Sequence, residues 1–161
     1  MFARHFIDSL DFAHQGKELR GEIPVAGMLR LQDVLATPDG KISYVLRGFR
    51  DEHGNPALEL VLDGSCQLRC QRCLQAMDYP IKQVSRLMLA DEQPESELSA
   101  DDFDSIPPDA HLDVAALVEE EILLGLPFAP RHEPGVCWAD AANLERGAET
   151  PFAVLRSLKD K

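Results

Sequence analysis

The stretch Cys66-Gln-Leu-Arg-Cys70-Gln-Arg-Cys73-Leu74 holds three of the four cysteines of this chain of 161 residues. The two residues between Cys70 and Cys73 let the backbone turn back, so that both thiolates can bind one cation. Apolar and polar residues alternate from Leu58 to Arg69, which predicts a strand that ends at this turn. We therefore expect a hairpin with the Cys-x-x-Cys pair at its tip and with Cys66 as a small core residue on the apolar face of the strand.

Two further residues of metal-ligand type, His132 and Cys137, follow far downstream. Together with Cys70 and Cys73 they would supply three cysteines and one histidine, a composition typical of structural zinc sites. Compact zinc modules have only roughly 12 to 20 residues between their ligand pairs, so here the fold would have to bring the pairs together. The alternative is that the cysteines are reduced structural thiols that cap the turn. A thioredoxin-type redox motif is disfavoured, because it begins a helix and both flanks here are strand-like.

Hydrophobic periodicity in the rest of the chain predicts an α+β fold. The expected architecture is an antiparallel β meander or partly open barrel with a packed central helix and short terminal helices. The strands lie between about residues 19 and 90, where Leu29, Leu31 and Val34 are expected to continue an extended course. Pro24 indicates that the first of these strands lies at a sheet edge, since proline cannot donate to a neighbouring strand.

The central helix is predicted over residues 113–124, with Asp113 capping its first turn. Apolar residues at helical spacing form a stripe that is expected to face the core: Val114, Leu117, Val118, Ile122 and Leu124. Glu121 lies on the side of this stripe, so that a buried Glu121 needs a cationic or hydrogen-bonding partner. The short terminal helices are predicted at residues 8–15 and 151–159.

Composition indicates one domain over residues 1–161, because 45% of the residues are hydrophobic and can form a real core. Residues 91–105 are acidic and interrupted by proline, which predicts a mobile loop, and residues 139–150 are expected to be loose. No run is long enough to span a bilayer, and the N-terminus gains charge too early for a secretory signal. We therefore expect a cytoplasmic protein.

The formal net charge is −12, from 16 Lys and Arg residues against 28 Asp and Glu residues. This balance disfavours broad contact with RNA, which requires a basic face, and favours a basic protein partner. Local contact with RNA or with a partner would use the few basic residues near the cysteine turn and the C-terminus: Arg69, Arg72, Arg156 and Lys159. The alternative for both groups is an ordinary solvated surface.

Four segments carry a resemblance to a known family: Cys70-Gln-Arg-Cys73-Leu74, the block from Leu112 to Pro127, Pro130-Arg-His132 with Cys137, and the segment from Pro151 to Lys159. In this order they resemble the bacterial YceD family, the large ribosomal RNA subunit accumulation proteins. Thr150 stands where that family usually has asparagine, and threonine can still cap the last helix. The resemblance implies a non-enzymatic factor in the biogenesis of the large ribosomal subunit, which supports accumulation or processing of 23S ribosomal RNA.

The partners that the resemblance implies are large-subunit ribosomal RNA or a basic large-subunit ribosomal protein, with no membrane and no small-molecule substrate. One competing hypothesis is a metal-dependent hydrolase or nuclease that uses the cysteine and histidine cluster. Another is a simple binding module for a basic ribosomal protein. No catalytic residues are predicted, because the sequence shows no Gly-rich phosphate loop and no Ser-His-Asp arrangement. Three cysteines and one histidine would fill all four zinc positions, which favours a structural zinc over a catalytic one.

Overall fold

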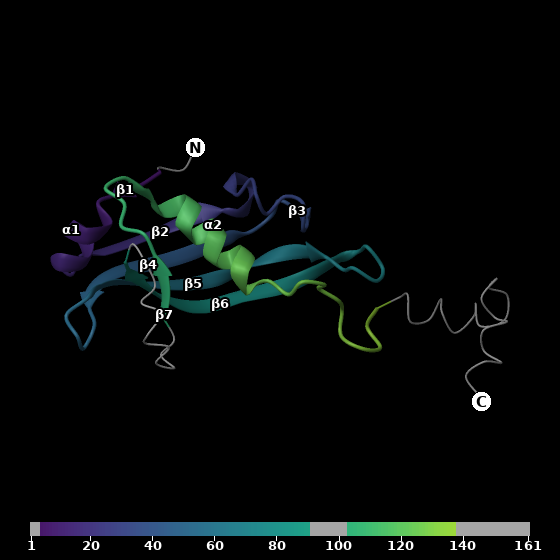
Figure 1. The fold of residues 1–161 in the computed structure, drawn as a ribbon. Helices are drawn as coiled ribbons and strands as arrows, with labels where there is room; N and C mark the ends of the chain where they lie inside the picture. Colours follow the sequence, from purple (N-terminus) through teal and green to yellow (C-terminus); the bar gives the residue numbers. More distant parts are fainter. Residues whose placement is uncertain (1–3, 91–102, 138–161) are drawn as a thin grey trace, which may run out of the picture.

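The computed structural model describes residues 4–90 and 103–137, and Figure 1 shows their arrangement. The predicted segments 139–150 and 151–159 lie outside the described residues, and so do Arg156 and Lys159. In chain order the elements are β1 (Phe6–Ile7), α1 (Ser9–His14), β2 (Glu18–Pro24), the 3-10 helix η1 (Val25–Gly27), β3 (Leu35–Thr37), β4 (Lys41–Arg50), β5 (Pro56–Arg69), β6 (Ala76–Leu89), β7 (Phe103–Ile106), β8 (Leu112–Asp113) and α2 (Val114–Gly125).

One open sheet forms the centre of the structure, with the strand order β2-β4-β5-β6-β7 and with β3 also paired to β5. The pairs β2–β4, β4–β5 and β5–β6 are antiparallel, whereas β7 runs parallel to β6. β1 and β8 form a separate two-stranded sheet, and α2 crosses one face of the large sheet (Figure 1). The predicted α+β class with an antiparallel meander is confirmed, and the sheet does not close into a barrel. None of the described helices is long and apolar enough to cross a membrane.

Side-chain alternation explains why the long strands share one core. Along β5, Leu58, Leu60 and Leu62 are fully buried, and the residues between them lie on the opposite face. Cys66 continues this buried set at 2% exposure, and burial raises the pKa of its thiol to about 11. The prediction that Cys66 is a core residue is confirmed.

Helix α2 packs its apolar side onto the sheet, as the sequence predicts. Asp113 caps the helix, because its side-chain oxygen accepts hydrogen bonds from the N–H groups of Ala115 and Ala116. Four residues of the predicted stripe are buried: Val114, Leu117, Val118 and Ile122. The fifth, Leu124, is 71% exposed, so that part of the prediction is wrong. The last turn of α2 lies over the edge of the sheet, and at that edge no described strand covers Leu124.

The buried Glu121 of α2 has the polar partner that its position requires. Glu121 is only 4% exposed, and the side-chain amide of Gln83 on β6 lies against it. Gln83 Nε2 donates to the backbone carbonyl of Glu121 at 3.0 Å and lies 3.5 Å from its carboxylate oxygen Oε2. The same amide also bonds to Ser85 Oγ at 3.0 Å. These contacts fix the C-terminal half of α2 to β6.

The first third of the chain contains the predicted short helix as α1, but the extended course predicted through Leu29, Leu31 and Val34 is not found. The side chain of Asp8 caps α1, and Gly16 follows the helix with a φ of 59°. Leu29, Leu31 and Val34 are not extended, which corrects the prediction, because this segment consists of turns. Glu119 of α2 accepts the N–H groups of Arg30 and Leu31, so the chain turns here and buries Leu31 completely.

Strand β7 has no clear signal in the sequence. It begins at Phe103, so the last three residues of the segment predicted as a mobile loop belong to this strand. Its four residues pair in parallel with Arg86–Leu89, and Ala90 N donates to Ile106 O at 3.0 Å. Residues 91–102, the rest of that predicted loop, lie outside the described residues.

Gly48 on β4 is the point at which α1 comes closest to the sheet. A Cβ at this position would lie 2.3 Å from the carbonyl oxygen of Phe12 and 2.7 Å from Ala13 Cα, and both atoms are backbone. We expect Gly48→Ala to push α1 off the sheet and to lower the free energy of unfolding by about 1 to 3 kcal/mol, as overpacked cores do. Urea unfolding measures this loss. Ser43→Ala, on the exposed face of the same strand, is the control and is expected to change stability by less than about 0.5 kcal/mol. Equal losses in the two variants would contradict the close approach.

Candidate metal centre

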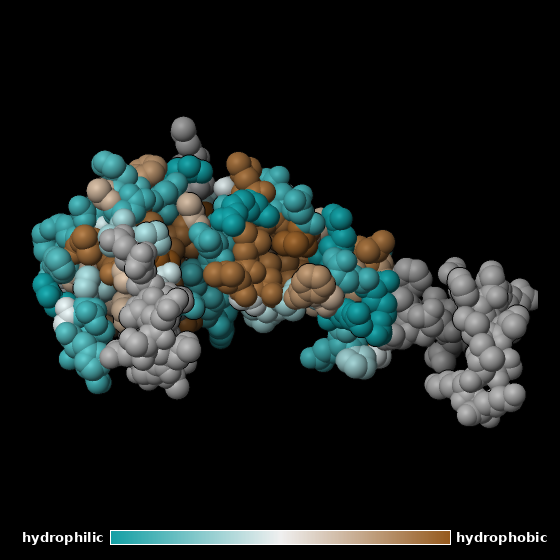
Figure 2. Space-filling model, in the orientation of Figure 1, coloured by the Kyte–Doolittle hydropathy of each residue, from teal (hydrophilic) through white to brown (hydrophobic). Residues whose placement is uncertain are grey.

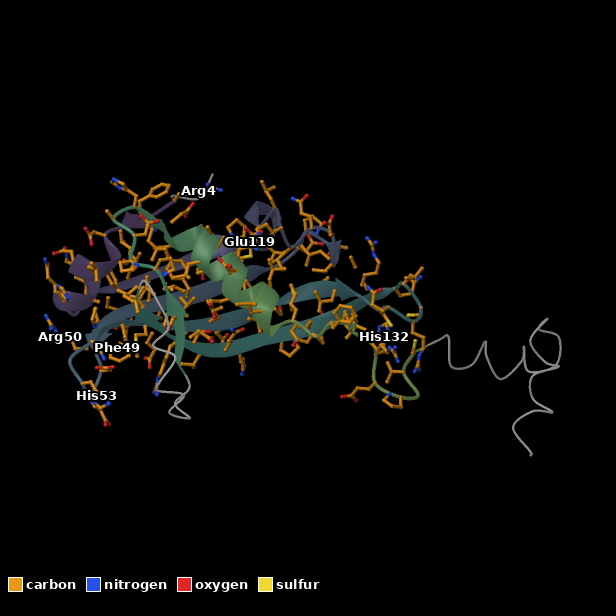
Figure 3. All side chains as sticks on the ribbon, viewed as in Figure 1. Arg4, Phe49, Arg50, His53, Glu119 and His132 are labelled. Carbon is orange, nitrogen blue, oxygen red and sulfur yellow. The ribbon has the colours of Figure 1, made fainter. Side chains whose placement is uncertain are left out.

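The four predicted ligand residues come together at one end of the sheet. One possible ligand atom from each of Cys70, Cys73, His132 and Cys137 lies within 4.8 Å of all the others. The three cysteines are buried, with exposures of 0%, 6% and 3% in that order, and His132 is half-buried. Figure 3 shows His132 beside the turn that joins β5 to β6. The prediction that these residues converge in space is confirmed.

A tight turn directs Cys70 and Cys73 to the same side of the hairpin. Cys70 N donates to Gln75 O at 3.0 Å, and Leu74 N donates back to Cys70 O at 2.8 Å. Leu74 has a φ of 62°, in the left-handed region that residues other than glycine rarely adopt. The left-handed conformation of Leu74 helps to reverse the chain directly after Cys73. Cys70 and Cys73 therefore lie within one tight turn, with their sulfurs close together.

The segment after α2 delivers the other two ligands to this turn. Gln71 N donates to Pro130 O at 2.8 Å, which holds the segment against the hairpin two residues before His132. A second turn then reverses the chain, with Gly135 at a φ of 86° and with Val136 N donating to Glu133 O at 3.1 Å. This turn returns the chain to the cluster and places Cys137 there. The Gln71 contact is backbone to backbone, so the sequence alone did not indicate it.

The distance between Cys73 and His132 agrees with tetrahedral zinc. Cys73 Sγ lies 3.5 Å from His132 Nδ1. Bonds of about 2.3 Å to sulfur and about 2.0 to 2.1 Å to nitrogen, at a tetrahedral angle, separate the two ligand atoms by about 3.6 Å. His132 Nε2 lies 3.2 Å from the carbonyl oxygen of Ala76. When Nε2 carries the proton and donates it to this carbonyl, Nδ1 keeps a lone pair that is directed into the cluster and can bind a metal. Histidine ligands of metals usually have this arrangement.

The protonation of the cysteines also favours a bound cation. Burial by itself raises the pKa of Cys70, but the N–H groups of Cys73, His132 and Arg72 donate to its sulfur and lower the pKa to about 5. The pKa of Cys73 is raised, first by burial and then by the sulfurs of Cys137 and Cys70, which outweigh a hydrogen bond from Gln75 N–H. The Cys70 thiolate is thus stabilised beside the Cys73 sulfur, whose pKa is raised, and a cation bound between the two sulfurs would favour ionisation of both.

These residues fit a zinc ion. They would hold it through three sulfur atoms and one nitrogen, which fills the four positions of a structural site and leaves none open for a substrate. All four cysteines of the protein are free thiols. Cys66 shows what an isolated buried thiol looks like in this fold, because burial is the cause that raises its pKa. Cys70 differs from Cys66, because backbone N–H groups donate to its sulfur and lower its pKa.

Two of the four predicted contact residues lie beside the cluster. Arg69 and Arg72 flank Cys70 and are exposed. Arg69 Nη2 donates to the carbonyl oxygen of Leu35 at 3.3 Å, which holds its guanidinium against β3. Sequence reasoning did not single out Arg131, although its position next to His132 could have indicated that it lies near the site. It also missed the groove between β6 and α2, because that groove arises from tertiary packing.

A family model described as large ribosomal RNA subunit accumulation protein YceD matches residues 58–159 of this chain. No solved structure matches the chain. The matched part includes nearly all of β5, the cysteine turn, α2 and the four residues of the cluster. It covers more than half of the chain and carries the complete ligand set. This protein therefore belongs to the YceD family of large ribosomal RNA subunit accumulation proteins.

Proposed function

We propose that this protein is a non-enzymatic cytoplasmic factor in large ribosomal subunit assembly, which supports accumulation of 23S ribosomal RNA. The observation that carries the proposal is the family match over residues 58–159. Among the described residues, the cysteine and histidine cluster could hold a metal, and its four ligands leave no coordination position for a substrate. This composition supports a structural zinc and weighs against the alternative of a metal-dependent hydrolase or nuclease.

Charge supports action through a basic large-subunit ribosomal protein rather than through extensive contact with RNA. A formal net charge of −12 repels phosphate and attracts a basic protein. Arg69, one of the few cations near the cysteine turn, already donates to a backbone carbonyl of β3. Association with a basic partner is expected to be fast and to weaken strongly as salt is added, because long-range charge attraction drives the encounter.

Deletion of the gene in its own organism tests the proposed function. The ratio of 23S to 16S ribosomal RNA is expected to fall in growing cells and to recover when the wild-type protein is supplied again. An unchanged ratio in the deletion strain would refute the function. A pull-down of the tagged protein, with and without nuclease treatment, then identifies the contact, since a partner protein that remains after nuclease treatment is bound directly.

A charge-reversal variant separates contact with protein from contact with RNA. Arg69→Glu combined with Arg72→Glu inverts the positive charge beside the cysteine turn, where direct RNA contact would be placed. We expect the folded double variant to support a normal 23S level in the deletion strain, because the partner in our proposal is a basic protein. A low 23S level from a double variant with wild-type stability and metal content would instead show that the turn contacts RNA.

A further inference from the structure

One hydrogen-bonding edge of β6 has no strand partner over most of its length in the described part of the chain. β5 pairs with β6 from Ala76 to Met88 on one side. On the other side β7 pairs only with Arg86–Leu89. Among residues 4–90 and 103–137, no strand pairs with this edge between Met77 and Ser85. Proteins normally shorten, cover or disrupt such edges, because unpaired backbone groups bind other chains.

Two contacts show which residues direct their backbone groups toward this edge. Ala90 N donates to β7, and Ala76 O accepts from His132 Nε2, so the even-numbered residues of β6 face away from β5. Asp78, Lys82 and Val84 therefore direct both N–H and C=O outward, and Pro80 directs only its carbonyl. The outward groups recur every second residue, at about 6.8 Å, which is the spacing that another extended backbone offers.

A groove of about 220 Å³ runs along this edge, between β6 and the end of α2. It is lined by Tyr79, Pro80, Ile81, Lys82 and Gln83 of β6 and by Ile122, Gly125 and Leu126. The groove is smaller than the roughly 300 to 1,000 Å³ of small-molecule sites, but it can receive individual side chains. Gln83 is held by Glu121, so the wall of the groove is already ordered. The groove therefore suits the side chains of an added strand better than it suits a metabolite.

Apolar side chains lie exposed on both faces of the sheet near this edge. Figure 2 shows apolar surface gathered over the C-terminal half of α2 and the segment that follows it. Leu124 is 71% exposed and Phe128 is 105% exposed, one on each side of Gly125 and Leu126 in the sequence. On the opposite face of the sheet, Val84 of β6 is 60% exposed. An added strand alternates its side chains between the two faces, so it would cover apolar surface on both.

We propose that the open edge of β6 binds an extended segment of a basic large-subunit ribosomal protein. The segment adds as a strand beside residues 78–84 and places alternate apolar side chains in the groove next to α2. An extended polypeptide fits, because it supplies N–H and C=O groups at strand spacing, which a helix or an RNA strand does not. The class of partner rests on the proposed function and on the net charge of −12, whereas the site rests on the geometry of β6.

A proline substitution tests the edge without touching the ladder to β5. Lys82→Pro removes an outward N–H and leaves the hydrogen bonds to β5 intact, and Pro80 already occupies an equivalent outward position. Lys82→Ala is the matched control, because it removes the same charge and keeps the N–H. The probes are overlapping synthetic peptides that tile the large-subunit ribosomal proteins. We expect particular peptides to bind the wild type and Lys82→Ala, and to bind Lys82→Pro about tenfold more weakly or not at all, since both a hydrogen bond and strand approach are lost.

Amide hydrogen exchange gives a direct readout of strand addition. The N–H groups of Asp78, Lys82 and Val84 are expected to exchange quickly in the free protein and to become protected when a binding peptide is added. The N–H groups of Ile81 and Gln83 point to β5 and are expected to be protected in both states, which makes them an internal control. Peptide binding that leaves the outward amides unprotected would overturn the proposal.

Other outcomes would also overturn it. Equal weakening in Lys82→Ala and Lys82→Pro would show that the side-chain charge, rather than the edge, binds the peptide. Outward amides that are already protected in the free protein would show that the edge is occupied without a peptide. If removing residues 138–161 makes these amides exchange quickly, that segment is the occupant. If dilution makes them exchange quickly, the occupant is a second copy of the chain. A folded Lys82→Pro that restores 23S as well as the wild type would overturn the edge site and leave the proposed function standing. The deletion strain tests that function separately.

Discussion

Replacing Cys73 with serine is expected to release zinc and to lower the stability of this protein more than any change in its core. Cys73 Sγ lies 3.5 Å from His132 Nδ1, so its loss removes one ligand from the centre of the cluster and leaves the remaining sulfurs without a complete site. Structural zinc contributes about 10 to 16 kcal/mol of apparent binding free energy in zinc-finger peptides, and here we expect a loss of at least about 5 kcal/mol. Elemental analysis of protein purified without chelator measures the zinc, and thermal unfolding measures the stability.

Cys66→Ala is the matched control for the cysteine substitution. Cys66 is as buried as the cluster cysteines but belongs to the leucine face of β5. The variant is expected to keep one zinc per chain and to lose only the free energy of a small cavity, about 1 kcal/mol. A wild-type protein that contains no zinc, and whose unfolding temperature is the same with and without chelator, would contradict the zinc centre and favour plain structural thiols.

Replacing Ile122 with alanine is expected to lower the free energy of unfolding by about 2 to 5 kcal/mol. Ile122 is 1% exposed and packs between α2 and the sheet, so the shorter side chain leaves a cavity that this rigid contact cannot close. Denaturant unfolding gives the value. Leu124→Ala, two residues further along the same helix, is the control, because Leu124 is 71% exposed. We expect that change to stay within about 0.5 kcal/mol. Similar losses in the two variants would mean that the C-terminal turn of α2 is buried in solution.

The features that sequence predicts well are those that neighbouring residues determine. The hairpin follows from alternation along β5, the helix from Asp113 and the apolar spacing after it, and the turn from the Cys-x-x-Cys spacing. The ligand types of the cluster were also readable, because three cysteines and a histidine form a recognisable zinc set. The convergence of the two halves was a prediction from shared chemistry, and the structure confirms it.

The features that sequence misses depend on contacts between distant segments. Residues 29–34 form turns, and Glu119 from across the fold accepts the N–H groups of Arg30 and Leu31 there. Strand β7 forms because β6 offers it a parallel partner, and its four residues give no period by themselves. Within the site, the hydrogen bond from Gln71 to Pro130 and the position of His132 against Ala76 O use backbone groups that carry no sequence signature. The open edge of β6 is visible only once the neighbours of that strand are known.

The separation of 59 positions between Cys73 and His132 has a consequence for the order in which this protein folds. Joining residues so far apart carries a loop-closure entropy cost, and contacts made early along a folding pathway tend to be local. We therefore expect the β5–β6 hairpin and α2 to form before Cys73 and His132 meet, so that a bound metal would complete a chain that is already collapsed. A ligand that binds after the folding transition state slows unfolding and leaves the folding rate almost unchanged. In the cell, bound zinc would thus set the lifetime of the folded protein rather than the rate at which it folds.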